Sequence, residues 1–528
     1  MQLRSTKSYV TLLSMTIMLS TSAQASDSLQ IRTDKGKVEG SFTSDQKARA
    51  FKGIPFAAPP VGDLRWQPPQ PATAWEGVRS AKEFGSHCFQ SATYNDMVFH
   101  DPGPSEDCLT LNVWTPANAR AGSLPVMVWI FGGGFVAGGT SERRQDGQFL
   151  AHKDVVVASM NYRLGIFGFF THPELTSESI HHASGNYGLL DQAAAIEWVK
   201  RNIAAFGGNP SNITIFGESA GSFSVSAQMA SPLAKGLLSK AIGESGGAFF
   251  SGGLPFEPRT VREDRDAHFA QSALHANTLA ELRKIPAEDL VKAATAKTTP
   301  PPPHFGPDID GYFLPDTVPS IYAAGKQAHI PVLAGWNADE ARGAVLNAKK
   351  KPTAESFTNE AKEQFGENAQ KFLDVYAAKT DAEAEKSAGD FAGDRFIAYS
   401  TWRWLEAHVK TGDATVYRYF FDFGSPGDKN HSAAMGAFHS DDIEYVFGTL
   451  DSRPGAVWRP EDRKLSEQMQ TYWTNFARTG DPNGGDLPKW PAYDPPKWEV
   501  LYLDAHPAAK PDPYRERYLF LDQMWAKD

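Results

Sequence analysis

The sequence predicts an α/β fold in which a large, mostly parallel central sheet carries helices on both faces. Apolar, β-branched segments at residues 109–114, 126–131 and 155–159 have the composition of buried strands. Between the last of these and a further strand at 213–216, residues 188–205 repeat apolar side chains at helical spacing. Strands that alternate with helices indicate a parallel sheet, and in such sheets the functional residues lie beyond the carboxyl ends of the strands.

The remaining chain extends this pattern on both sides. Further strands are expected at residues 29–33, 50–54, 241–244, 331–335 and 416–421. No linker, internal repeat or charge block divides the chain, because the proline-rich run at 299–304 is too short to separate domains. We therefore expect residues 26–528 to form a single domain, although this length exceeds the usual domain size.

The first 25 residues have the pattern of a signal peptide. A basic start containing Arg4 and Lys7 precedes an apolar run at residues 9–19, and Ala-Gln-Ala at 23–25 is a small-residue cleavage site. The apolar run is too short to span a bilayer, so no transmembrane anchor is expected. The sequence thus predicts cleavage near Ala25 and export of the mature chain to the periplasm or the medium.

Charge and cysteine content limit the partners. The net charge of −10 argues against a nucleic-acid partner, which requires a basic face. Two cysteines in an exported chain predict one disulfide, Cys88–Cys108, which should contribute about 3 kcal/mol to stability by closing a short loop. No cluster of His or Cys has metal-ligand spacing, so neither a metal nor a cofactor is expected.

Gly-Glu-Ser-Ala-Gly at residues 217–221 is the strongest local motif. It follows a strand-like run and precedes a helix-compatible segment, the context in which a sharp turn exposes a nucleophilic serine. A second copy at residues 243–247 also follows an apolar run, but no helix follows it. The N-terminus of a helix stabilises an oxyanion, and only the first copy is followed by a helix. We therefore assign the nucleophile to Ser219. Ser245 is expected to be a neighbour of the site or an ordinary loop residue.

A serine nucleophile requires a base, an orienting acid and donors for the oxyanion. Three glycines at residues 132–134 directly follow the strand at 126–131, so their N–H groups can converge on an oxyanion together with that of Ala220. The alternative for these glycines is a dinucleotide-binding loop. That loop would need a hydrophobic helix after it and an acidic residue at the end of the next strand, and the sequence has neither.

The base and the acid are less well determined by the residues alone. Where the nucleophile lies in a Gly-x-Ser-x-Gly turn, the acid and then the histidine follow the serine along the chain. His439 lies in a Gly-led loop and His431 in a similar one, so both remain candidates for the base. Asp339 and Glu340 both follow the strand at 331–335, and either can serve as the acid.

A series of ordered motifs resembles the type-B carboxylesterase/cholinesterase family of α/β-hydrolases. The resemblance runs from about Leu29 to the C-terminus. Besides the Ser219 motif, it covers residues 51–57, 64–66, 105–113, 161–165, 185–192 and 436–439. It implies the α/β-hydrolase fold and hydrolysis of a small-molecule carboxylic ester.

The resemblance also implies roles for individual residues. It implies Ser219 as nucleophile, Glu340 as acid, His439 as base, Gly133, Gly134 and Ala220 as oxyanion hole, and Glu218 and Ser245 as supporting residues. The family's acid motif, Asp-Glu-Gly, reads Asp-Glu-Ala here, with Ala341 in place of the glycine. Cys88–Cys108 matches the family's first disulfide, and two pairs match its internal ion pairs, Arg65 with Glu106 and Arg163 with Asp191.

The sequence therefore predicts an exported serine carboxylesterase that works through an acyl-enzyme. A lipase, feruloyl esterase, thioesterase or amidase would use the same residues, and a non-catalytic adhesion protein of the same fold is the remaining alternative. The sequence specifies neither the ester nor the oligomeric state. Five aromatic residues are candidates for an apolar pocket: Phe305, Phe391, Phe396, Trp402 and Trp404.

Overall fold

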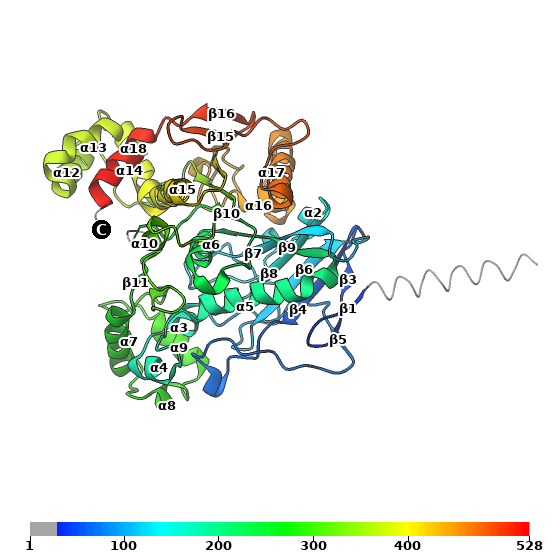
Figure 1. Cartoon of the computed structure of the whole chain (residues 1–528). Helices are drawn as coiled ribbons and strands as arrows, with labels where there is room; N and C mark the ends of the chain where they lie inside the picture. Colours follow the sequence, from blue (N-terminus) through cyan, green and yellow to red (C-terminus); the bar gives the residue numbers. More distant parts are fainter. Residues whose placement is uncertain (1–28, 251, 253, 527–528) are drawn as a thin grey trace, which may run out of the picture.

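The computed structural model describes residues 29–250, 252 and 254–526, and an eleven-stranded sheet runs through this part of the chain (Figure 1). The strands lie in the order β16 (Ala508–Pro511), β15 (Glu499–Leu503), β14 (Val416–Phe421), β13 (Val332–Asn337), β10 (Lys240–Glu244), β9 (Gly208–Glu218), β7 (Leu124–Ile130), β8 (Val156–Met160), β6 (Thr110–Pro116), β4 (Ala48–Pro55) and β3 (Ser41–Phe42). All neighbours from β8 to β15 are parallel, and the strands outside this block pair antiparallel. The predicted mostly parallel sheet is confirmed.

Helices cover both faces of the sheet. Those of the described chain are α2 (Gln148–Ala151), α3 (Gly165–Phe169), α4 (Pro173–Glu178), α5 (Tyr187–Asn202), α6 (Ala220–Ala230), α7 (Arg259–Ala273), α8 (Leu279–Leu282), α9 (Ala287–Ala294), α10 (Val318–Ala323), α11 (Arg342–Leu346), α12 (Ala354–Phe365), α13 (Ala369–Val375), α14 (Asp381–Gly393), α15 (Tyr399–Thr411), α16 (Ile443–Phe447), α17 (Pro460–Thr479) and α18 (Arg515–Trp525). Helices α5 and α6 contact β9, α17 contacts β7, and α2 contacts β8. In Figure 1, α2 and α17 lie above these strands and α5 lies below them. Because both faces are covered, strands such as β7 and β8 are buried almost throughout.

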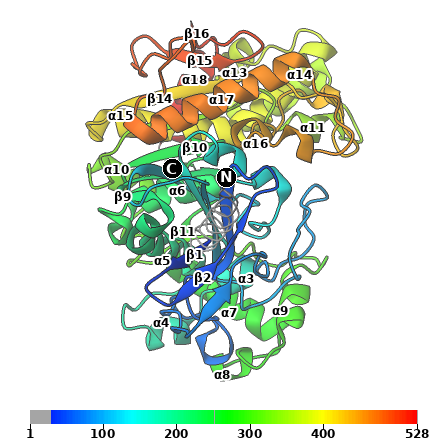
Figure 2. The ribbon, with the colours of Figure 1, turned by 90° about the vertical axis from the view of Figure 1, so that its right-hand side faces the viewer.

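The predicted strands agree with the observed ones to within a few residues. Residues 29–33 contain β1 (Gln30–Arg32), which lies outside the large sheet: it pairs with β2 (Lys37–Glu39), and β2 pairs with β5 (Val78–Ser80). Figure 2 shows β1 and β2 next to each other, below the yellow-to-red C-terminal segments.

Several strands were not predicted. They include the short strands β2, β3 and β5, the two-stranded ladder of β11 (Glu257–Pro258) and β12 (Asp308–Ile309), and strands β15 and β16. Strand β16 lies at the sheet edge and contains a proline and exposed residues, so its strand signal is weak.

The register of the central strands determines where the candidate residues meet. Glu218, the last residue of β9, lies opposite Glu244, the last residue of β10. Glu244 in turn lies opposite Gly335 of β13. The segments that follow these three strands therefore leave the sheet at the same edge, as expected for the carboxyl ends of parallel strands.

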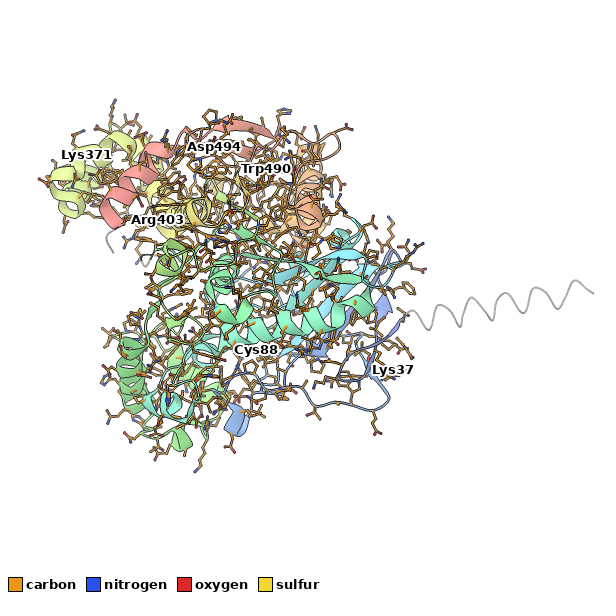
Figure 3. All side chains as sticks on the ribbon, viewed as in Figure 1. Lys37, Cys88, Lys371, Arg403, Trp490 and Asp494 are labelled. Carbon is orange, nitrogen blue, oxygen red and sulfur yellow. A yellow bond between two sulfur atoms is a disulfide. The ribbon has the colours of Figure 1, made fainter. Side chains whose placement is uncertain are left out.

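Aromatic and charged side chains are packed together in the C-terminal half of the core. Trp490 is fully buried and donates its indole N–H to the carbonyl of Arg418 (Figure 3). Arg418 forms a buried ion pair with Asp512, and its guanidinium lies 4.4 Å from the ring centroid of Trp336. This cationic group is thus held by one carboxylate and by ring faces.

Both ion pairs implied by the resemblance are present. Arg65 Nη2 lies 2.6 Å from Glu106 Oε2, and Arg163 Nη2 lies 2.7 Å from Asp191 Oδ1. The second pair is buried, so removal of one partner would leave an uncompensated charge, which costs several kcal/mol (~3–5). We regard both pairs as structural.

The predicted disulfide is confirmed, because Cys88 and Cys108 are bonded to each other. The bond closes the loop of residues 88–108, and both cysteines are buried (Cys88 is labelled in Figure 3). The predicted signal peptide, residues 1–25, lies outside the described residues. Within the described part, no helix has the length and apolar character needed to cross a membrane.

The double variant Cys88→Ser, Cys108→Ser should unfold at a lower temperature than the wild type. Loss of the crosslink lets the unfolded chain gain conformational entropy, which lowers stability by about 3 kcal/mol. Thermal unfolding followed by circular dichroism measures the difference. Wild-type protein treated with reductant should match the variant, whereas equal midpoints for oxidised wild type and variant would contradict a stabilising role.

Candidate active site

Ser219 occupies a sharp turn between β9 and α6. Its φ of 54° and ψ of −124° lie in a region that residues with a side chain seldom adopt. The turn requires small neighbours, because a Cβ on Gly221 would lie 1.9 Å from the carbonyl oxygen of Ile130. Ser219 therefore leaves the strand end with its side chain directed away from the sheet, and α6 starts at the next residue.

Backbone N–H groups converge in front of this turn. Gly133 and Gly134 follow β7 with φ of 98° and 63°, values that favour glycine. Among the described residues, no hydrogen bond uses the N–H of either glycine. Ala220 is the first residue of α6, so its N–H has no acceptor within the helix. These three donors are available to an anionic oxygen beside Ser219.

One histidine connects Ser219 to a carboxylate. His439 Nε2 lies 2.8 Å from Ser219 Oγ, and His439 Nδ1 lies 2.5 Å from Glu340 Oε2. A carboxylate accepts, so Nδ1 carries the proton and Nε2 accepts from the serine hydroxyl. Glu340 is fixed in turn, because the Asn337 N–H and the Ser245 hydroxyl donate to its Oε1 at 2.8 and 2.6 Å.

The alternative acid and base lie elsewhere. Asp339 accepts a hydrogen bond from the Ala437 N–H at 3.1 Å and anchors the loop that carries His439. A Cβ on Gly436, which has a φ of 67°, would lie 2.0 Å from the same carboxylate. His431 stacks on Phe438 and hydrogen-bonds to Asp428. Asp339 and His431 thus support the loop and do not contact Ser219.

Several buried carboxylates surround the imidazole. Glu218 Oε1 lies 3.3 Å from His439 Nε2, and burial raises the pKa of Glu218 to about 8. Burial also raises the pKa of Asp442 to about 7, an effect that the charge of Glu340 strengthens. Burial alone would lower the pKa of His439, but the carboxylates of Glu218 and Glu340 outweigh it and raise this pKa to about 9. The neighbouring carboxylates therefore stabilise the positive charge that His439 acquires when it accepts a proton.

A pocket of about 180 Å³ opens in front of Ser219. Its lining includes the glycine loop, Glu218, Ser219 and His439, and apolar side chains such as Phe131, Leu254 and Ile443. Of the five aromatic candidates, only Phe396 lines it, 5.0 Å from the imidazole of His439 between ring centroids. The other four pack in the core: Phe305 on Phe269, Phe391 on Phe372, Trp402 on Trp498, and Trp404 donating to Tyr322.

The loop closed by the disulfide forms one wall of this pocket. Tyr94, Asp96 and Met97 come from this loop and line the pocket beside the glycines. A Cβ on Gly133 would lie 3.1 Å from Met97 Cε, and one on Gly134 would lie 3.3 Å from the Tyr94 hydroxyl. Sequence reasoning did not identify this wall, since no local signal shows where a loop far from Ser219 in sequence will lie.

The combined geometry is suited to acyl transfer. A hydroxyl, an imidazole and a carboxylate form one hydrogen-bonded chain, and the glycine loop with its unused N–H groups lines the same pocket as Ser219. The structure thus brings together Ser219, Ala220, Gly133, Gly134, His439 and Glu340, with Glu218 and Ser245 in direct contact with this group.

Comparison with known proteins identifies the family. A model of the carboxylesterase family matches residues 27–521. The fumonisin B1 esterase of Sphingopyxis macrogoltabida is 36% identical over 498 residues, 89% of this chain and 86% of the relative. The para-nitrobenzyl esterase of Bacillus subtilis (strain 168) is 35% identical over 504 residues, 92% of this chain and 97% of the relative.

Solved structures agree with this result. The carboxylesterase EST55 of Geobacillus stearothermophilus superposes with a TM-score of 0.80 at 33% identity, over 93% of this chain and 99% of the other. A para-nitrobenzyl (PNB) esterase structure gives 0.79 at 35% identity, over 92% and 98%. The chain therefore belongs to the carboxylesterase family and is a carboxylic ester hydrolase with the α/β-hydrolase fold.

Proposed function

We propose that this carboxylesterase is exported and hydrolyses its ester through an acyl-enzyme formed on Ser219. The observation that carries the proposal is the chain of hydrogen bonds from Ser219 through His439 to Glu340, with 2.8 and 2.5 Å between the heavy atoms. A serine hydroxyl is a weak nucleophile unless an adjacent base accepts its proton. His439 is that base, and Glu340 keeps its imidazole in the required tautomer.

In the first half-reaction, Ser219 Oγ forms a bond to the ester carbonyl carbon as its proton moves to His439 Nε2. The carbonyl oxygen becomes an oxyanion and accepts hydrogen bonds from the N–H groups of Gly133, Gly134 and Ala220. The bond to the alcohol oxygen then breaks, and His439 returns the proton to the leaving alcohol. The carboxylate of Glu340 stabilises the imidazolium that exists between these two steps.

In the second half-reaction, water takes the place of the alcohol. His439 accepts a proton from the water as its oxygen bonds to the acyl carbon, and the same N–H groups stabilise the second oxyanion. Collapse releases the carboxylic acid and returns the proton to Ser219 Oγ. The net reaction consumes one water and one ester and yields one acid and one alcohol.

Export is supported by two features. Residues 1–25 have the charge pattern, apolar run and small-residue site of a signal peptide. The Cys88–Cys108 disulfide is typical of an oxidising space such as the periplasm or the medium. We propose that the mature enzyme begins near Ser26.

Ser219→Ala should abolish ester hydrolysis, whereas Ser245→Ala should keep most of it. Loss of a nucleophile costs several orders of magnitude in kcat (~10⁴–10⁶), because among the described residues no other hydroxyl forms a hydrogen bond with His439. Loss of the Ser245 hydroxyl removes one of the donors to Glu340, for an expected decrease of about tenfold or less in kcat. Initial rates with a 4-nitrophenyl ester measure both variants. Similar rates for the two would overturn the choice of Ser219.

Glu218→Gln should shift the acid limb of the pH–rate profile to lower pH. His439 must be neutral to accept a proton, so activity appears as the pH rises through the pKa of His439. The carboxylate of Glu218 helps to raise that pKa above its ordinary value, and its removal therefore lowers it. The dependence of kcat/KM on pH measures the shift.

The exposed variant Glu355→Gln serves as the control, because it changes the net charge equally at a distance from the imidazole. Its profile should coincide with that of the wild type. An acid limb that stays in place or moves upward in Glu218→Gln would contradict the electrostatic account.

A further inference from the structure

A second chamber adjoins the catalytic pocket. It has a volume of about 390 Å³, roughly twice that of the pocket in front of Ser219. Asp96, Glu142, Arg144 and Ser440 line both cavities. Because Ser440 directly follows His439 in the chain, this shared wall lies beside the imidazole. The two cavities are therefore neighbours that share four lining residues.

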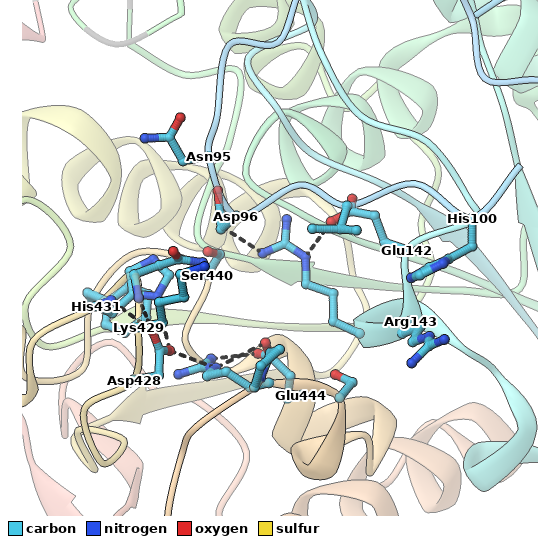
Figure 4. A pocket seen from close by; sticks show the side chains of 17 residues that line it. Asn95, Asp96, His100, Glu142, Arg143, Asp428, Lys429, His431, Ser440 and Glu444 are labelled. Carbon is cyan, nitrogen blue, oxygen red and sulfur yellow. Dashed lines mark hydrogen bonds and ion pairs between the residues drawn. The ribbon is translucent and has the colours of Figure 1, made fainter. Parts of the chain in front are cut away.

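The chamber differs from the pocket in chemical character. Figure 4 shows charged and amide side chains gathered around it, from the disulfide loop, from the segment after the glycine loop and from the segment before His439. Its charged lining consists of Asp96, Glu142, Asp428, Glu444, Arg143, Arg144, Lys429 and Arg453, with His100 and His431 in addition. The catalytic pocket, by contrast, is lined by several apolar and aromatic side chains.

All four carboxylates of the chamber are held by two arginines. Arg144 lies 3.2 Å from Asp96 and 2.9 Å from Glu142. Arg453 lies 2.8 Å from Glu444 and 3.7 Å from Asp428, and it also pairs with Asp441 behind the chamber wall. Figure 4 shows these contacts as two separate clusters. The carboxylates are therefore already engaged with cationic groups.

Two cations remain without a partner. Among the described residues, the side chains of Arg143 and Lys429 form no ion pair or hydrogen bond, and both are exposed. Figure 4 shows them on opposite sides of the chamber, with His100 beside Arg143. The side chains of Asn95 and Asn430 also line the chamber and can donate hydrogen bonds. The unused groups of the lining are thus mainly donors, and two of them are charged.

We propose that the chamber binds a carboxylate carried by one half of the substrate ester. With the ester carbonyl at Ser219, that half extends across the shared wall of Ser440 and Arg144 into the chamber, where its carboxylate accepts hydrogen bonds from Arg143 or from Lys429. Such charge-assisted bonds are stronger than neutral ones and favour an anionic ester over a neutral one of the same shape. The inference rests on the proposed function, because it places the reacting bond at Ser219.

The carboxylate can belong to the acid half or to the alcohol half, and two matched pairs of substrates distinguish these sources. For the acid half, 4-nitrophenyl hydrogen adipate is compared with its terminal amide. For the alcohol half, 4-acetoxybenzoate is compared with 4-acetoxybenzamide. In each pair only the charge changes, so the ratio of the two kcat/KM values reports the contribution of the chamber.

The wild type should prefer the anionic ester in at least one pair by about tenfold or more. The double variant Arg143→Gln, Lys429→Gln should reduce that ratio to about one while it leaves kcat/KM for the neutral ester unchanged. The control Lys235→Gln, Lys371→Gln removes the same charge from exposed sites outside both cavities and should keep the wild-type ratio. Added salt should lower the wild-type preference, because both cations are exposed.

Equal rates for the anionic and the neutral ester of both pairs in the wild type would overturn the proposal. So would a preference that survives in the chamber variant or that disappears in the control. These outcomes are independent of the proposed function, since hydrolysis of the neutral esters and its loss in Ser219→Ala test the catalytic residues separately.

Discussion

The site depends on the register of three parallel strands at the centre of the sheet. Glu218 of β9, Glu244 of β10 and Gly335 of β13 lie opposite one another across the two ladders. Because β9 and β10 end at the same height, the residue that follows each of them can donate its N–H to the next strand of the sheet. Ser219 donates its N–H to the carbonyl of Glu244, and Ser245 donates its N–H to that of Gly335.

This arrangement concentrates negative charge around a single imidazole. Glu218 and Glu340 contact His439 directly, and Asp442 and Glu244 are buried nearby. Burial without a full set of cationic partners raises the pKa values of Glu218, Glu244 and Asp442. The same field favours a positive charge on His439, the charge that the proposed mechanism creates when Ser219 loses its proton.

The sequence specified the elements whose signals are local. The Ser219 turn was predictable because Gly-Glu-Ser-Ala-Gly requires only a strand before it and a helix after it. The choices between Asp339 and Glu340, and between His431 and His439, were open on residue chemistry alone. They depend on tertiary contacts, since Asp339 binds the backbone of Ala437 and His431 stacks on Phe438. The family resemblance favoured Glu340 and His439, the two residues that contact each other here.

Features formed by distant loops were not predictable. The disulfide was expected from two cysteines in an exported chain. No sequence pattern in the loop that it closes predicts that Tyr94, Asp96 and Met97 line the pocket. The ion pair of Asp96 with Arg144 joins this loop to the segment after the glycines, and both residues line the pocket as well as the charged chamber. Such contacts arise from packing and not from any periodic pattern.

The central claim is that Ser219 forms the covalent intermediate beside the three N–H groups. A crystal structure of the enzyme after reaction with a 4-nitrophenyl phosphonate tests it most directly, because the adduct resembles the tetrahedral oxyanion. The account predicts a bond from Ser219 Oγ to phosphorus, with the phosphoryl oxygen within hydrogen-bond distance of the N–H groups of Gly133, Gly134 and Ala220. A phosphonate on Ser245, or a phosphoryl oxygen directed away from these groups, would contradict it.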